Sequence, residues 1–118
     1  MAIAKLKQRK GRNVPPHIPN IFEAAASNNV DELQLALSHY DIDVQHEETQ
    51  MSPIHYAIAY GGEEAAALLI DQGANLTTTD QFNRTPLRLL NEVHGYGTDI
   101  LSQTREKLHE RVLENTGF

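Results

Sequence analysis

The chain has 118 residues, of which 40% are hydrophobic, and this size fits a single domain with a small core. It contains no cysteine, which excludes a disulfide framework and a thiolate metal site. No apolar run approaches the ~18 residues that a membrane-spanning helix needs, and no apolar segment follows the N-terminal charges as it would in a Sec signal peptide, so we expect a cytoplasmic or otherwise intracellular protein.

The net charge of -6 is unevenly distributed along the chain. Five of the ten Lys and Arg residues lie before residue 13, whereas none of the sixteen acidic residues precedes Glu23. We therefore predict a basic and flexible N-terminal arm over residues 1–18, followed by an acidic folded domain over residues 19–118. The arm could be a solubilising tail, an electrostatic contact with an acidic surface, or an attachment to nucleic acid or membrane. Because the acidic body opposes docking on phosphate, we do not expect nucleic acid to be the partner.

The first predicted helices lie within residues 21–37, which are rich in alanine and leucine. Asn20 is a suitable N-cap for the first of them, since its side chain can accept from a free N–H of the first turn. Asn28 and Asn29 interrupt the segment, and asparagine tolerates the left-handed backbone of a tight turn. This pattern predicts two short helices joined by a turn.

Residues 52–84 show the clearest helical pattern. Ser52 is a good N-cap and Pro53 suits the first helical position, where its missing N–H costs nothing. Apolar residues then recur at the i, i+3, i+4 spacing of a helix face, namely Ile54, Ala57 and Ile58. A second helix is predicted from about Glu63 to Asp71, with Gly73 suited to the left-handed position that ends it.

A third pair of helices is predicted near the C-terminus. Its first helix spans residues 86–93, and the glycines at 95 and 97 end it. A longer final helix follows, with Leu101, Leu108 and Val112 on one face.

The segment Ser52-Pro53-Ile54-His55-Tyr56-Ala57 returns further along the chain as Thr85-Pro86-Leu87-Arg88-Leu89-Leu90. This motif and its spacing resemble the ankyrin repeat, whose signature T-P-L-H-x-A recurs about every 33 residues. The resemblance implies an all-α fold, an ankyrin-repeat solenoid of stacked helix-loop-helix units with short hairpin loops. The units are then about 19–51, 52–84 and 85–118, the last a divergent cap. Gln50 and Asn83 replace the loop glycine before each motif, and Arg88 replaces the second histidine. An unrelated small helical bundle is the competing architecture.

Six histidines raise the question of catalysis or metal binding. The family resemblance implies that His55, in the motif, hydrogen-bonds locally and holds a loop. His39 and His46 have a spacing that matches no common zinc pattern. Paired carboxylates such as Glu47-Glu48 and Glu63-Glu64 are adjacent in sequence, whereas catalytic pairs oppose one another across a cleft. We therefore predict no enzyme, no cofactor and no metal site.

The resemblance implies a protein–protein interaction module that binds another protein through its concave surface of loop tips and first helices. The residues that we expect to contact the partner are Glu48, Met51, Tyr60, Phe82 and Arg84. For Phe82 an alternative is that it anchors the third unit. Two other functions remain open: an inhibitory regulator that masks an enzyme's active site with the help of the basic arm, and a small metal-binding protein or enzyme that uses the loop histidines.

Overall fold

The structure is a computed structural model that describes residues 17–95 and 101–115, and no β-strand occurs within these two ranges. The helices of this part of the chain are α2 (Ile21–Ala26), α3 (Val30–Leu37), α4 (Pro53–Ala59), α5 (Glu63–Asp71), α6 (Pro86–His94) and α7 (Ser102–Asn115). The predicted all-α class is confirmed. The basic residues of the predicted arm all lie outside the described residues.

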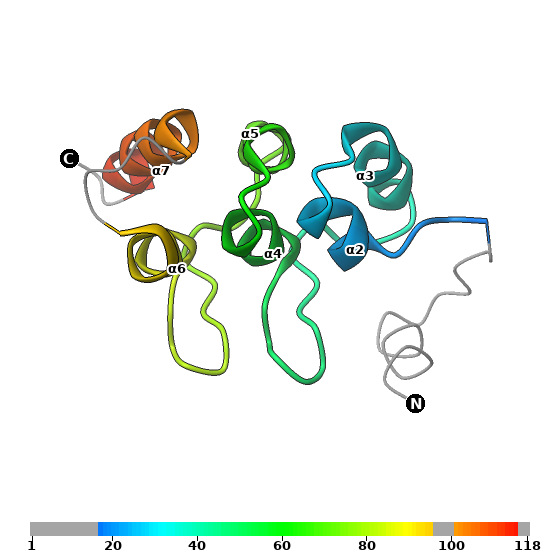
Figure 1. The fold of residues 1–118 in the computed structure, drawn as a ribbon, viewed down its shortest axis with the longest axis horizontal. Coiled ribbons are helices and arrows are strands. Elements are labelled where there is room, and N and C mark those ends of the chain that lie inside the picture. The colour runs from blue at the N-terminus through cyan, green and yellow to red at the C-terminus, as the bar shows by residue number, and fades with distance from the viewer. Residues whose placement is uncertain (1–16, 96–100, 116–118) are drawn as a thin grey trace.

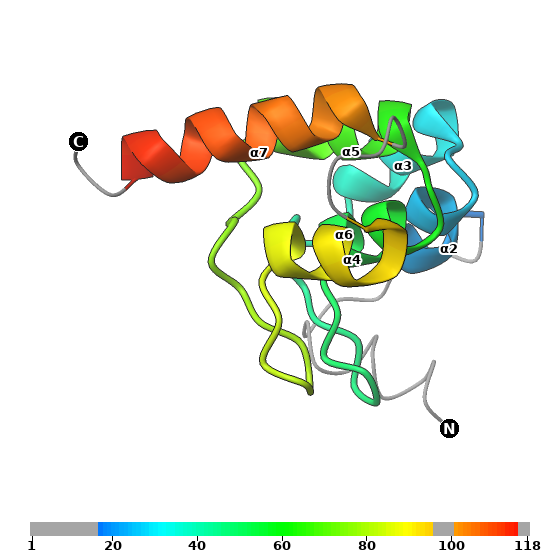
Figure 2. The ribbon, with the colours of Figure 1, turned by 60° about the vertical axis from the view of Figure 1, so that its left-hand side comes forward.

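The helices form two layers (Figures 1 and 2). The first layer holds α2, α4 and α6, and the second layer holds α3, α5 and α7. Each first-layer helix is followed by a return helix in the second layer, so three helix-loop-helix units stack along the molecule. This arrangement is the solenoid that the repeat predicted, because one helix pair cannot bury its own apolar surface without a neighbour.

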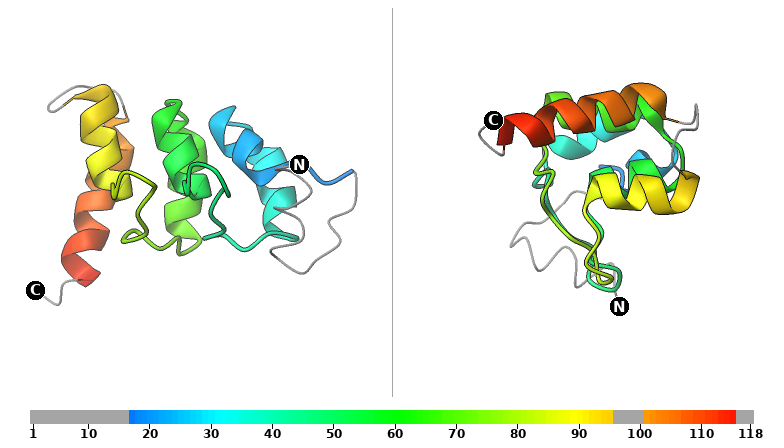
Figure 3. Two further views of the ribbon diagram at one scale, coloured as in Figure 1. Left: turned by 90° about the horizontal axis from the view of Figure 1, so that it is seen from below. Right: turned by 90° about the vertical axis from the view of Figure 1, so that its left-hand side faces the viewer.

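Two long loops reach past the first layer to the same side of the molecule (Figures 1 and 3). We call their tips finger 1, residues 46–51, and finger 2, residues 80–84. Each tip is closed by backbone hydrogen bonds: His46 N–H donates to Met51 O at 2.9 Å, and Asp80 N–H donates to Arg84 O at 3.1 Å. Gln81 N–H also donates to Thr49 O at 3.0 Å, so the two fingers are joined.

The positions where glycine is usual in such turns keep their left-handed backbone although asparagine or glutamine occupies them. Asn28, Gln50 and Asn83 have φ angles of 60°, 62° and 64°. Asparagine adopts this region at low cost, whereas for a longer side chain such as that of Gln50 the cost is higher. The replacements that the sequence shows therefore leave the turn geometry intact.

The core lies between the two layers and is built from branched aliphatic residues and alanines. Its fully buried large side chains include Ile21, Leu33, Ile54, Ile58, Leu69, Leu89 and Leu108. Each such burial contributes about 1.5–3 kcal/mol. Alanines in the helices have no exposed surface, and their small size allows close approach; they are Ala24, Ala25, Ala36, Ala57, Ala65 and Ala66.

The third unit ends the stack with a longer helix, as the sequence predicted. Helix α7 has 14 residues against 9 in α5. Its residues Thr104 and Leu108 are fully buried, and Lys107 Nζ lies 3.3 Å from Asp71 Oδ1 of α5. The Arg105 guanidinium donates to Asn91 and to Gly95 O, the carbonyl at the C-terminus of α6. The last helix is thereby held to both neighbouring helices.

Candidate functional site

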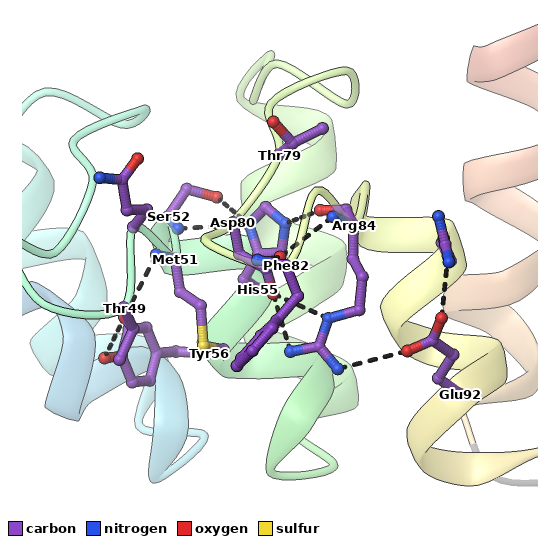
Figure 4. Close-up of polar contacts among 12 residues, drawn as sticks. Thr49, Met51, Ser52, His55, Tyr56, Thr79, Asp80, Phe82, Arg84 and Glu92 are labelled. Carbon is purple, nitrogen blue, oxygen red and sulfur yellow. Dashed lines mark hydrogen bonds and ion pairs between the residues drawn. The ribbon is translucent and has the colours of Figure 1, made fainter.

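The imidazole of His55 ties the start of α4 to finger 2. Its Nδ1 accepts from the backbone N–H of Ser52 at 3.2 Å, and its Nε2 lies 2.9 Å from Arg84 O, to which it donates (Figure 4). The side chain has no exposed surface. Burial lowers the pKa of His55, which outweighs the rise caused by the Arg84 carbonyl and the Asp80 charge. His55 is therefore a neutral structural residue, which agrees with the role that the motif implied.

The hydroxyl of Ser52 lies 2.8 Å from His55 Nδ1, a distance that would suit a nucleophile and its base. However, Ser52 is 1% exposed and His55 is 0% exposed. The other imidazole nitrogen is occupied by the Arg84 carbonyl. Because a substrate cannot reach this pair, its geometry supports the fold and not catalysis.

Finger 2 is organised around a buried carboxylate. The side chain of Asp80 is 1% exposed, and its Oδ1 accepts from the N–H groups of Phe82 and Arg84 at 2.9 and 3.0 Å. Its Oδ2 pairs with the Arg84 guanidinium at 2.8 Å. Burial alone would raise the pKa of Asp80, but the hydrogen bonds from Arg84 and from the two backbone N–H groups outweigh it, so the pKa lies below its usual value.

Arg84 connects this carboxylate with helix α6 and with an exposed aromatic ring. Its guanidinium pairs with Glu92 at 3.4 Å and lies 5.1 Å from the centroid of the Phe82 ring (Figure 4). The Phe82 side chain is nevertheless 64% exposed. Its face is therefore held at a defined place on the surface by a cation–π contact.

A second aromatic group joins finger 1 to α2 and α4. The rings of Phe22 and Tyr56 have centroids 5.2 Å apart, and the ring of His46 lies 5.3 Å from that of Phe22. The hydroxyl of Tyr56 lies 3.0 Å from Thr49 Oγ1 in the finger. Tyr60, one helical turn after Tyr56, has its ring centroid 6.3 Å away with the planes nearly parallel.

These aromatic side chains line a groove of about 340 Å³ whose walls also include Asn20, Glu23 and Ala26. Tyr60 is 67% exposed at this groove. Burial raises the pKa of the Tyr56 phenol, and the charges of Tyr60 and Glu48 add to this rise. The groove itself combines aromatic faces with the carboxylate of Glu23.

The residues that the sequence analysis selected for partner contact differ in their surroundings. Glu48, Tyr60 and Phe82 are exposed. Met51 is half-buried and packs against the core. The Arg84 side chain is 20% exposed and is committed to Asp80, so its role in the fold is larger than the sequence indicated.

The described residues contain no group of three His, Asp or Glu side chains that could hold a metal ion. Two of the histidines besides His55 make structural hydrogen bonds. His46 Nδ1 accepts from Glu48 N–H at 3.1 Å, and His94 Nε2 lies 2.7 Å from Ile58 O, which links α6 to α4. In the described parts of the chain no helix is long and apolar enough to cross a membrane.

Of the residues that line the groove, only Tyr60 was selected from the sequence as a partner contact. Phe22 falls within a predicted helix, and His46 was considered only as a metal ligand. The spacing of Tyr56 and Tyr60 is i, i+4, which places two side chains on one helix face and could have indicated a shared surface. No local signal brings Phe22 and His46 together, since a helix and a loop separate them in the sequence.

Comparison with known proteins agrees with this architecture. A family model described as ankyrin repeats in three copies matches residues 21–91, more than half of the chain. The chain is 34% identical over 84 residues to the transient receptor potential cation channel subfamily A member 1 homolog of Caenorhabditis elegans. The aligned region covers 70% of this chain and 7% of that protein. The chain is also 32% identical over 72 residues to the ankyrin repeat-containing protein P1E11.10 of Schizosaccharomyces pombe, and this aligned region covers 58% of the chain and 33% of that protein. The match thus spans only a small part of these relatives.

Proposed function

The chain belongs to the ankyrin-repeat family, whose members are generally protein–protein interaction modules and typically not enzymes, and from this premise we propose that it binds a protein partner through one surface. The surface consists of fingers 1 and 2 and the first-layer helices α4 and α6. We propose that Tyr60 and Phe82 are its main contacts, with Glu48 at the rim.

The observation that carries this proposal is the exposure of two large aromatic side chains next to this joined surface. Tyr60 and Phe82 are 67% and 64% exposed. An aromatic side chain buries about 150 Å² or more when it is fully covered, so each has much surface left to offer a partner. Aromatic residues in such positions are enriched among the residues that dominate binding energy. Each is also held in place, Tyr60 against Tyr56 and Phe82 against Arg84, so little conformational entropy is lost on binding.

The remaining selected residues have supporting roles in this proposal. Arg84 positions Phe82 through its pair with Asp80, and Met51 offers a half-buried thioether between the finger and the core. Glu48 is exposed at the tip of finger 1, where a charge affects the rate of association more than the affinity.

The proposal is tested by capture of proteins from a cell lysate on the immobilised full chain. We expect a protein that the wild-type chain retains and that Tyr60→Ala and Phe82→Ala each lose. Titration of that protein should then show each variant weakened by about 1–3 kcal/mol. Circular dichroism of the variants confirms that the helices remain.

Matched controls come from the second layer, on the opposite side of the molecule. Gln34 on α3 and Gln72 at the end of α5 are exposed. Gln34→Ala and Gln72→Ala should retain the captured protein at the wild-type level. If these two variants lose it while Tyr60→Ala and Phe82→Ala keep it, the partner binds the second layer and the proposal is wrong.

A further inference from the structure

The groove between α2, α4 and finger 1 has a floor and an edge of different character. Phe22 lies at its floor and is 3% exposed, whereas Tyr60 at its edge is 67% exposed. The faces of aromatic rings carry partial negative charge, so a groove lined by them attracts cations as well as apolar groups.

Among the described residues, those that line the groove carry only negative formal charge. Glu23 lines it, and Glu48 lies in finger 1, where its backbone N–H donates to the ring of the lining residue His46. Residues 13–83 contain eleven of the sixteen acidic residues of the chain and not one lysine or arginine. Within the described residues, no ion pair joins Glu23 or Glu48 to a cation.

The cations of the described region all lie at its C-terminal end, from Arg84 onward, and each is already engaged. Their contacts are Arg84 with Asp80, Arg88 with Glu92, Arg105 with Gly95 O, and Lys107 and Arg111 with Asp71. None of them is among the residues that line the groove. The charge that would complement the groove must therefore come from outside this part of the chain.

Finger 2 shows which group suits such surroundings. There a guanidinium lies 5.1 Å from an aromatic centroid and pairs with a carboxylate at 2.8 Å. The residue that corresponds to Arg84 in the preceding repeat is Met51, so finger 1 has no arginine of its own at the equivalent place. The groove beside finger 1 has the aromatic rings and the Glu23 carboxylate but, among the described residues, no lysine or arginine.

We infer that this groove takes an arginine or lysine side chain from a basic segment of the partner protein. This inference rests on the proposed function and names the chemistry that one part of the surface recognises. An apolar side chain at the same place would bring apolar surface against Glu23 and remove water from its carboxylate without compensation. A cation compensates this carboxylate and gains from the aromatic faces.

The test uses blocked nonapeptides with one Gly/Ser backbone whose central residue is arginine, citrulline or norleucine. Citrulline has nearly the shape of arginine without its charge. The full ¹⁵N-labelled chain is titrated with each peptide and followed by NMR. We expect the arginine peptide to bind roughly tenfold more tightly than the citrulline peptide, with shifts at the amides of Asn20, His46 and Tyr60. Equal affinity for the three peptides, or shifts confined to α3 and α7, would overturn the inference.

Two matched pairs of variants locate the site. Glu23→Gln should weaken the arginine peptide several-fold, whereas Glu32→Gln, which neutralises an exposed acid on α3, should not. Tyr60→Ala should weaken it similarly, whereas Phe82→Ala should not, because Phe82 does not line the groove. Equal effects within either pair would contradict the assignment.

A variant of the 118-residue chain with glutamine in place of the five basic residues before residue 13 distinguishes a cation of the chain's own arm from a cation of the partner. If the arginine peptide binds this variant but not the wild-type chain, the chain's own arm occupies the groove and the inference of a partner's side chain is wrong. The peptide experiment and the capture experiment can also fail independently of each other. Loss of the captured protein in Phe82→Ala without any peptide binding leaves the proposed function standing and removes only this inference.

Discussion

The side-chain oxygen of Asn28 accepts a hydrogen bond from the backbone N–H of Ala65 at 2.8 Å, so the turn of the first unit caps helix α5 of the second. The amide nitrogen of Asn28 also donates to Glu64 Oε1 at 2.6 Å. The N-cap residue of α5 is Gly62, which has no side chain to cap with. A Cβ at residue 62 would lie 3.1 Å from Ala25 O, and this close approach of the two units explains why the cap comes from the neighbouring unit.

Asn28→Gly should lower the free energy of unfolding by about 1 kcal/mol, because glycine keeps the left-handed backbone but removes the cap. Gln50→Gly is the matched control, since Gln50 has a φ of 62° and an exposed side chain. It should leave stability unchanged or raise it slightly. Urea unfolding of both variants checks this, and an equal response of the two would show that the Asn28 cap contributes nothing.

His55→Gln should destabilise the protein by roughly 1–3 kcal/mol, because the carbonyl of Arg84 and the N–H of Ser52 lose a buried partner. The pH dependence should change as well. Because burial lowers the pKa of His55 in the folded state, the unfolded chain takes up this proton first as the pH falls below 6.5. The histidine thus makes the wild-type protein lose stability between 6.5 and the lower folded-state pKa. The free energy of unfolding, measured by urea unfolding above and below pH 6.5, should fall less with decreasing pH in His55→Gln than in the wild type.

Asp80→Asn should lower the free energy of unfolding by about 1–3 kcal/mol. The asparagine amide oxygen accepts more weakly than the buried carboxylate, which holds the Arg84 guanidinium and two backbone N–H groups of finger 2. The pKa of Asp80 lies below its usual value of 3.8, so its stabilisation is present above that pH and is lost as the pH falls through the folded-state pKa. Asp31→Asn on the exposed face of α3 is the control and should be nearly neutral. Thermal unfolding at neutral pH compares the two, and similar melting temperatures would contradict the importance of the buried carboxylate.

Phe82→Ala should change stability by less than about 0.5 kcal/mol, because the side chain is 64% exposed. Leu69→Ala, in the fully buried core of α5, should cost about 2–5 kcal/mol. A small change in stability for Phe82→Ala beside a large one for Leu69→Ala would show that Phe82, unlike Leu69, contributes little to folding. A loss of several kcal/mol in Phe82→Ala, measured by urea unfolding, would support the alternative that Phe82 anchors the third unit.

The sequence by itself determined the fold class and most helix limits. A capping residue followed by proline and an apolar face at helical spacing are local signals, and they occur at residues 52–58 and again at residues 85–90. Helices α4 and α5 therefore occur where the pattern of residues 52–84 predicts them. The exposure of Phe82 in a polar loop could also be expected, since few apolar neighbours surround it in the sequence.

Only the tertiary structure decided which side chains meet across the units. The groove joins Phe22, His46 and Tyr60, and the cap joins Asn28 to Ala65; in each case the partners are separated by a turn and a helix or more. Arg84 was selected from the sequence as a partner contact, and only the structure shows that the buried carboxylate of Asp80 also holds it, because the backbone of finger 2 folds around that charge. Such contacts depend on how two units stack, and stacking is set by the close approach of alanines and glycines, which carry no signal of what lies opposite them.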